Sequence, residues 1–329
     1  MPQELAVRPH TDLQGPDALL HADREKARQD IAENARSSAT RRAYAADWRS
    51  YEAWCALRNI APIPASGDDV CAHLAWLEGD GYSLSAIERA YSAIALFQRA
   101  ASAPGWEPPR GYPPRVRDVL KALRRKLGAD KHGKNPIVKQ DLASIIGAID
   151  GDGLLALRDR ALLLLGFWSA SRRSELVALN VADVAFVAEG VTLKLRKSKT
   201  DQDGKGIEKA CAARPDALCP ARALRGWLDA AEISEGAVFR AVNRWGQVSA
   251  EPLAHGAVAK ILKQRCAAVG LDPSLFAGHS LRSGFATTAA KGKKGLAPIM
   301  KQLGHRDTRS TLVYIRHASL FDDNATDGL

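Results

Sequence analysis

The chain has 329 residues, a formal charge of +10 at pH 7 and 46% hydrophobic residues. This length exceeds the usual size of one domain, so we expect two domains, each with its own core. The positive balance favours a nucleic-acid partner, although charge alone does not choose between DNA, RNA and a membrane surface. An apolar signal region is absent from the N-terminus, and the longest apolar run, 161–170, is too short to cross a bilayer. We therefore expect a cytoplasmic protein with no membrane partner.

Cysteine and glycine patterns exclude several other classes. The five cysteines are scattered and form no CxxC pair, which argues against a disulfide framework and a zinc ribbon. Neither phosphate-binding glycine motif of nucleotide-binding proteins occurs, and the eight histidines show no metal-ligand spacing. We expect reduced thiols, no cofactor and no metal.

The N-terminal third predicts a helical module behind a tail. Residues 1–36 mix proline, glycine and charge without an apolar period, which predicts a flexible N-terminal tail. Apolar residues then recur at spacings of three and four, typical of amphipathic helices. The four predicted helices run from Ser38 through Cys55, from Asp68 through Leu77, from Ser83 through Phe97, and from Val116 through Leu127. Residues 37–127 are the predicted helical domain.

Basic side chains gather at two places in this module. The candidates for contacts with nucleic acid are Thr40, Arg41, Arg42, Lys121, Arg124, Arg125 and Lys126. A solvated helix face explains such charges as well as phosphate contacts do, so charge alone leaves both readings open.

Residues 128–137 lack periodicity and read as a linker, followed by a second domain over 138–329. Its pattern predicts a helix at 138–149, a long apolar helix within 154–179 that carries an Arg172 turn, and a strand at 191–195. The turn-rich segment 201–206 follows, which places Lys199 at the tip of a hairpin. Helices return around 224–227, 258–266, 282–290 and 299–303. This domain should be mostly helical with a small sheet.

Side chains suited to phosphate chemistry lie near the C-terminus. His279 and Arg282 are three residues apart, so on a helix they share a face and can reach one small anion. Arginine's planar fork suits phosphate oxygens, and a nearby tyrosine, Tyr314, can attack a phosphodiester. Singly, each residue also fits an ordinary structural role, and Gly304-His305 also reads as a turn. A further arginine, Arg172, follows a buried helix and needs a partner there.

Five motifs together carry a family resemblance. They are Arg172-x-Ser174-Glu175-Leu176 after an apolar helix, Ser198-Lys199-Thr200 after a strand, His279-x-x-Arg282, Leu303-Gly304-His305, and Tyr314 nine residues later. In this order and spacing, the chain resembles the tyrosine recombinases of the phage integrase family. The resemblance covers roughly 37–317 and is strongest to the Cre-like branch.

The resemblance implies a fold and a set of partners. It implies a mainly α protein, in which a four-helix, SAM-like core-binding domain and a catalytic domain with a small antiparallel sheet form a C-shaped clamp around DNA. It also favours phosphate contacts for the basic residues of the first domain. Four protomers would assemble on double-stranded DNA with an inverted-repeat core site. Because 36 residues are too few for an additional arm-binding domain, we expect short core sites.

The resemblance also implies roles for individual residues. Tyr314 would be the nucleophile that forms a 3′-phosphotyrosine, and Lys199 the general acid, with Lys197 and Lys205 as alternatives on the same hairpin. Arg172, His279, Arg282 and His305 would complete the catalytic set, and Glu175 would orient it. The chain departs from the family pattern at two positions. Position 170 is Ala, where the family commonly has glycine, and Arg173 adds a charge beside Arg172.

The expected function is site-specific recombination of DNA, with strand exchange through a Holliday junction. Two alternatives stay open on the sequence alone. The same nucleophile would serve a type IB topoisomerase-like enzyme that relaxes DNA, and a DNA-binding protein without catalysis would keep the same motifs.

Overall fold

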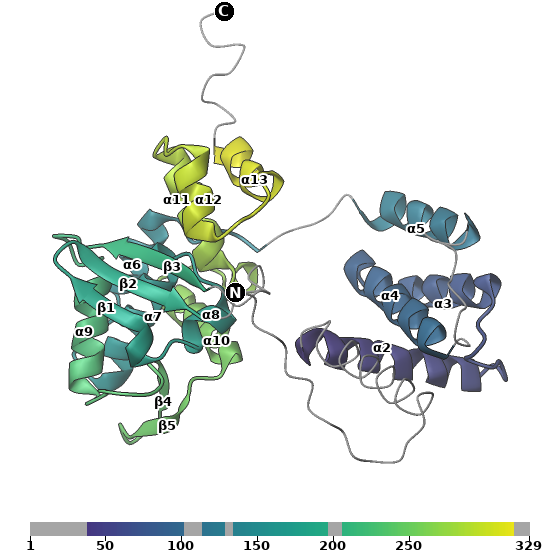
Figure 1. The fold of residues 1–329 in the computed structure, drawn as a ribbon, viewed down its shortest axis with the longest axis horizontal. Coiled ribbons are helices and arrows are strands. Elements are labelled where there is room, and N and C mark those ends of the chain that lie inside the picture. Colours follow the sequence, from purple (N-terminus) through teal and green to yellow (C-terminus); the bar gives the residue numbers. More distant parts are fainter. Residues whose placement is uncertain (1–37, 102–113, 129–133, 197–205, 319–329) are drawn as a thin grey trace, which may run out of the picture. The chain divides into compact units, whose positions relative to one another are not determined.

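The computed structural model describes residues 38–101, 114–128, 134–196 and 206–318. The chain divides into two compact units, 1–132 and 133–329. Figure 1 shows the first as helices only and the second as helices around a small sheet. The predicted tail over 1–36 and the predicted acid Lys199 lie outside the described residues.

Four helices form the described part of the first unit: α2 (Ser38–Ala56), α3 (Gly67–Gly79), α4 (Leu84–Ala101) and α5 (Pro114–Leu127). Their apolar faces meet in one core around Tyr51, Leu74, Ile87 and Leu120, each at most 1% exposed. Helix α3 begins at Gly67, one residue before the predicted start at Asp68. Ser66 caps this helix, because its hydroxyl accepts a hydrogen bond from the Asp69 amide.

The second unit holds eight α-helices and five strands among its described residues. The helices are α6 (Lys139–Gly147), α7 (Leu154–Trp168), α8 (Arg173–Val177), α9 (Pro220–Ala230), α10 (His255–Ala268), α11 (Ser280–Lys291), α12 (Leu296–Leu303) and α13 (Arg309–Ala318). The segment 134–137, which precedes α6, is hydrogen-bonded to the rest of the unit. The strands are β1 (Val184–Val187), β2 (Gly190–Leu195), β3 (Ile207–Ala212), β4 (Arg240–Val242) and β5 (Val248–Pro252).

Two short 3-10 helices, Val181–Asp183 and Pro273–Leu275, also lie among the described residues of this unit.

The strands form two antiparallel sheets, one with the order β1-β2-β3 and one of β4 and β5. Val191, Leu193 and Leu195 of β2 are buried, and α9 packs on β2 and β3. Helix α7 is buried along most of its length and contacts α9 and α11. The predicted fold class, mainly helical with a small antiparallel sheet, is confirmed.

The apolar helix predicted within 154–179 is α7, which ends at Trp168, and the Arg172 turn follows it. Ala170 then adopts the left-handed conformation with φ of 49°. A non-glycine residue in this region interrupts a right-handed helix, so Arg172 begins the separate helix α8.

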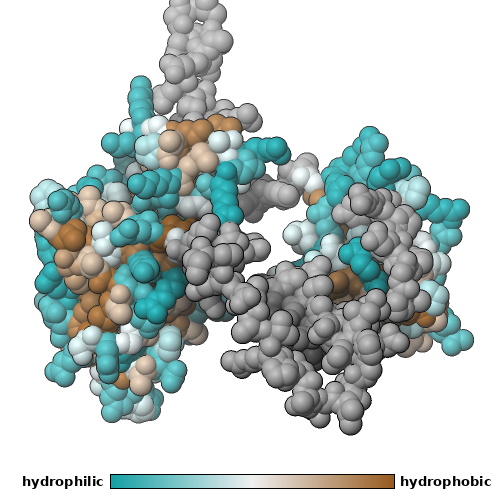
Figure 2. All heavy atoms as spheres, viewed as in Figure 1, coloured by the Kyte–Doolittle hydropathy of each residue, from teal (hydrophilic) through white to brown (hydrophobic). Residues whose placement is uncertain are grey.

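Figure 2 shows one face of the second unit, on which hydrophobic areas lie between hydrophilic ones. Across the described ranges, no helix combines the length and apolar character needed to cross a membrane.

Close packing on α11 gives a test of the fold. A Cβ at Gly284 would lie 1.7 Å from the Ile137 carbonyl oxygen, whereas a Cβ at Gly226 in α9 meets nothing within 4 Å. We expect Gly284→Ala to lower the free energy of unfolding of this unit by about 2–3 kcal/mol, because α11 must move away from the 134–137 segment. Gly226→Ala, the matched control, should raise it by about 0.5–1 kcal/mol. Denaturant unfolding measures both, and equal effects would contradict the packing.

Candidate active site

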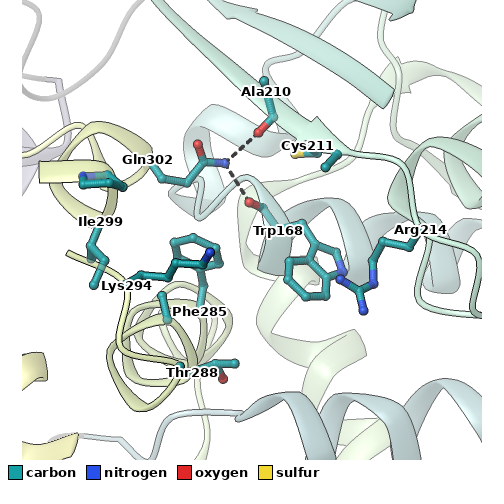
Figure 3. Close-up of a pocket in the computed structure, with 13 residues that line it drawn as sticks. Trp168, Ala210, Cys211, Arg214, Phe285, Thr288, Lys294, Ile299 and Gln302 are labelled. Atoms are coloured by element: carbon teal, nitrogen blue, oxygen red, sulfur yellow. Dashed lines mark hydrogen bonds between the residues drawn. The ribbon is translucent and has the colours of Figure 1, made fainter. Parts of the chain in front are cut away.

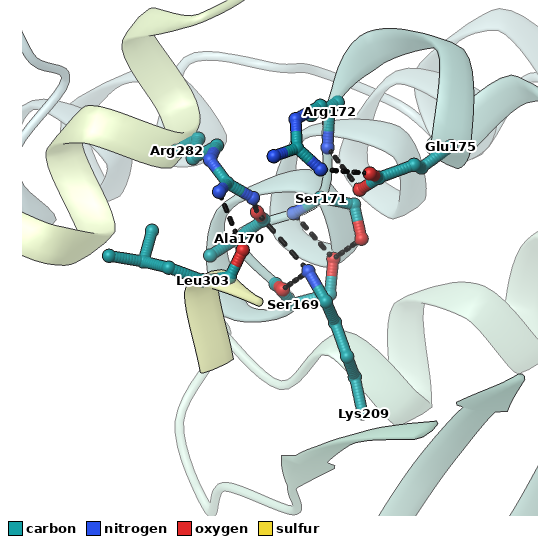
Figure 4. Close-up of polar contacts among 8 residues, drawn as sticks. All are labelled: Ser169, Ala170, Ser171, Arg172, Glu175, Lys209, Arg282 and Leu303. Atoms are coloured by element: carbon teal, nitrogen blue, oxygen red, sulfur yellow. Dashed lines mark hydrogen bonds and ion pairs between the residues drawn. The ribbon is translucent and has the colours of Figure 1, made fainter. Parts of the chain in front are cut away.

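The turn between α7 and α8 shapes one wall of the site. The hydroxyl groups of Ser169 and Ser171, on either side of Ala170, form a hydrogen bond of 2.8 Å. Arg172 lies at the N-cap of α8, where its amide donates to Glu175 Oε2 at 2.8 Å and its Nη1 to Oε1 at 2.5 Å. Glu175 therefore holds Arg172 through backbone and side chain together, as Figure 4 shows.

Arg282 in the first turn of α11 crosses the interior of the unit. Its side chain is 1% exposed, and it donates from Nη1 to Ala170 O at 2.7 Å and from Nη2 to Leu303 O at 2.5 Å. Burial, followed by the charge of Arg172, lowers its pKa to about 10, so the guanidinium stays charged at neutral pH. One side chain thus ties the α7–α8 turn to the end of α12.

Gly304 ends α12 and sets the direction of His305. It adopts the left-handed conformation with φ of 63°, which glycine reaches without steric cost. His305 Nδ1 lies 2.8 Å from the Thr311 hydroxyl of α13. Burial, then the charges of Arg282 and Arg172, lowers the His305 pKa to about 4. A neutral imidazole results, with one N–H to donate.

His279 and Tyr314 meet at the open side of the site. His279 is the N-cap of α11 rather than a residue within the helix, and its Nε2 lies 3.5 Å from the Tyr314 hydroxyl. The His279 pKa is lowered, first by partial burial and then by the charges of Arg282, Arg172 and Arg173. One side of the His279 side chain remains open to solvent. Burial raises the pKa of Tyr314 and Arg282 opposes this rise. The phenol is therefore protonated at neutral pH beside a neutral histidine.

Arg173 lies directly over Gly278. A Cβ at Gly278 would fall 1.9 Å from Arg173 Cδ, so only glycine leaves room for this side chain beside His279. The additional charge noted in the sequence thus borders the site.

The structure brings five of the predicted catalytic residues together: Arg172, His279, Arg282, His305 and Tyr314. Glu175 joins them through Arg172. The predicted acid Lys199 lies in the segment between β2 and β3, outside the described residues.

Lys209 on β3 lies in the same cluster and was not predicted from the sequence. It is 3% exposed, and its Nζ donates to Ser169 O at 2.9 Å. The available signal was the strand period, because Ile207, Lys209 and Cys211 alternate onto one face of β3.

The predicted DNA contacts of the first unit are spread over α2 and α5. Thr40 is half-buried, and the six basic residues are exposed. Two of them form ion pairs within the unit, Arg124 with Glu88 at 2.7 Å and Lys126 with Glu78 at 2.8 Å. These pairs fix the two side chains against α4 and α3.

A cavity of about 600 Å³ lies between β3, α11 and α12, lined in part by Trp168, Phe285 and Ile299. Figure 3 shows Gln302 beside it, donating to Trp168 O at 2.7 Å and to Ala210 O at 3.1 Å. No predicted catalytic residue lines the cavity. Gln302 fixes α12, and so Gly304-His305, against α7 and β3.

Ligands for a metal do not gather in the part of the chain that the structure describes: no three His, Cys, Asp or Glu side chains are placed to hold an ion. Among the described residues, the positive charges that face the site are those of the arginines and Lys209, and Glu175 supplies a carboxylate beside them.

Comparison with known proteins identifies the family of the chain. The model of the phage integrase family matches residues 137–320. An integrase/recombinase XerD homologue of Selenomonas ruminantium is 36% identical over 294 residues, which cover 89% of this chain and 86% of that protein. The chain belongs to the phage integrase family. Within it, the chain is a tyrosine site-specific recombinase, an enzyme of DNA strand breakage and rejoining, and the predicted function is confirmed.

Two solved structures share the fold. The Tn1549 transposon integrase in complex with transposon right-end DNA has a TM-score of 0.64 at 15% identity, over 88% of this chain and 92% of that one. The XerH recombinase bound to palindromic difH substrate has a TM-score of 0.59 at 16% identity, over 78% of this chain and 70% of that one. The closer resemblance to the Cre-like branch stays a prediction.

The contact between Glu175 and Arg172 predicts a pH-dependent stability. Burial raises the Glu175 pKa, but the hydrogen bonds from Arg172 outweigh this effect and lower the pKa below 4.5. The contact therefore stabilises the fold above pH 4.5, and this stabilisation is lost as pH falls through the folded pKa. We expect Glu175→Gln to cost about 2 kcal/mol of unfolding free energy at pH 7 and progressively less below pH 4.5. Denaturant unfolding across this range measures the difference. Glu251→Gln, on exposed β5, is the control, and a pH-independent cost for Glu175→Gln would refute the assignment.

Proposed function

We propose that Tyr314 is the nucleophile of this recombinase and that the phosphate binds between Arg172, Arg282, His279 and His305. The observation that carries the proposal is the 3.5 Å separation of the Tyr314 hydroxyl from His279 Nε2, beside a buried guanidinium. The phenolic oxygen forms a bond to phosphorus, and the bond from phosphorus to the 5′ oxygen breaks. The product is a 3′-phosphotyrosine and a free 5′ hydroxyl.

Proton transfer is needed at both oxygens. Tyr314 has a raised pKa, so its proton must pass to a base, and the neutral imidazole of His279 is within reach of it. The charges of Arg172 and Arg282 then stabilise the negative charge that builds on the non-bridging oxygens, and His305 donates a hydrogen bond. Attack by a 5′ hydroxyl from another strand reverses these transfers and rejoins DNA without a cofactor.

The departing 5′ oxygen requires an acid. We assign this role to Lys199, which follows β2 in the sequence. Lys197 and Lys205 in the same segment are the alternatives.

The proposed partner is double-stranded DNA with an inverted-repeat core site, bound by four protomers in the cytoplasm. The Tn1549 transposon integrase binds transposon right-end DNA and XerH binds a palindromic difH substrate, which supports this partner. Both units of each protomer would contact the duplex. Basic residues of α2 and α5 would contact phosphates from the first unit.

Covalent capture tests the nucleophile and reveals the target. Protein is incubated with fragmented genomic DNA of its source, protein-linked DNA is precipitated in detergent, and the DNA is sequenced. We expect adducts at inverted half-sites from the wild type and at least a hundredfold fewer from Tyr314→Phe, since the phenol oxygen is absent. Equal recovery from both proteins would reject Tyr314 as nucleophile.

A sulfur-substituted substrate tests the acid. A 5′-bridging phosphorothiolate replaces the 5′ oxygen of the cleaved bond with sulfur. The thiolate that is released on cleavage leaves without needing a proton. We expect the Lys199→Ala variant to cleave ordinary DNA about 10²–10⁴ times more slowly than the wild type. Its rate of cleavage of the phosphorothiolate substrate should lie within about tenfold of the wild-type rate. Lys197→Ala and Lys205→Ala are the matched controls and should cleave both substrates normally. A defect of Lys199→Ala that persists with sulfur would remove it from this role.

A further inference from the structure

Lys209 occupies a position where a strand normally places an apolar side chain. It pairs with Leu193 of β2 in the central sheet and is 3% exposed. Burial of an ammonium group is costly unless it is paired and hydrogen-bonded. Its Nζ meets this requirement with the carbonyl oxygens of Ser169 at 2.9 Å and Ala170 at 3.4 Å. Figure 4 shows Lys209 reaching from β3 to this turn.

We infer that Lys209 is a positioning residue for the phosphate site, which holds the 169–171 turn and adds a fixed positive charge behind it. Ala170 O accepts from both Lys209 and Arg282, and Arg172 follows the turn directly. Removal of the ammonium leaves the Ser169 carbonyl without this donor and loosens the turn that precedes Arg172 and accepts a hydrogen bond from Arg282. The inference rests on the proposed function only in that the ligand is a phosphate diester.

The charge of Lys209 depends on its surroundings. The groups that face it are Glu175, Arg172, Arg282, Cys211 and His305. Burial lowers the Lys209 pKa to about 8, against the attraction of Glu175. Burial also raises the Cys211 pKa to about 12, so this thiol stays neutral beside it. The ammonium is therefore charged at pH 7, and its charge is lost as pH rises through 8.

Tungstate, a tetrahedral dianion, probes the site without DNA or catalysis. Its affinity is measured by calorimetry on the full chain for the wild type, Lys209→Met, Lys209→Arg and Lys194→Met, an exposed lysine of the same sheet. At pH 7 we expect about tenfold weaker binding for Lys209→Met, a change within about threefold for Lys209→Arg, and none for Lys194→Met. Circular dichroism establishes that each variant is folded.

The pH dependence separates a charged role from a merely structural one. Between pH 7 and pH 9 the wild type should lose most of the affinity that Lys209 supplies, whereas Lys209→Arg keeps its charge and should bind nearly equally at both values. The comparison of wild type with Lys209→Arg stands even where Lys209→Met does not fold. Equal affinities and pH profiles in the wild type and both variants would overturn the inference. Because tungstate binding needs no nucleophile, failure of Tyr314 to form adducts leaves this result unaffected.

Discussion

The buried guanidinium of Arg282 is the interaction on which the rest of the site depends. A charge that is 1% exposed must direct its N–H groups to fixed acceptors, and here these are the carbonyls of Ala170 and Leu303. The two carbonyls lie at the end of α7 and at the end of α12. Helix termini that leave carbonyls without intrahelical partners thus supply the acceptors. The same contacts bring Arg172 and His305, the neighbours of these termini, to the two sides of Arg282.

The balance of charge in this cluster favours an anion. Arg172, Arg282 and Lys209 face one carboxylate, that of Glu175, while the depressed pKa values keep both histidines neutral. Two neutral imidazoles serve the reaction better than two cations would, because one can take a proton and the other can donate a hydrogen bond. The buried positive charge therefore has two effects: it attracts phosphate, and it maintains the protonation states that cleavage requires.

The sequence predicted much of this arrangement, for physical reasons that differ between its parts. Helices of the first unit follow from apolar spacings, as at Tyr51, because one buried face is a local pattern. The catalytic cluster follows from motif spacing. The left-handed conformation of Ala170 after α7 was not predictable from the apolar run, because it is stabilised by contacts with Arg282 and Lys209 from distant segments. Lys209 itself was missed because a lysine within a strand is ordinarily exposed.

Mass spectrometry of the trapped intermediate tests the central claim most directly. DNA-linked protein is digested with nuclease and trypsin, and the peptide 310–316, which contains Tyr314 as its single tyrosine, is sequenced. The account predicts a nucleotide attached through its 3′ phosphate to the Tyr314 oxygen. A nucleotide on Ser310, on Thr311 or on another peptide would contradict it.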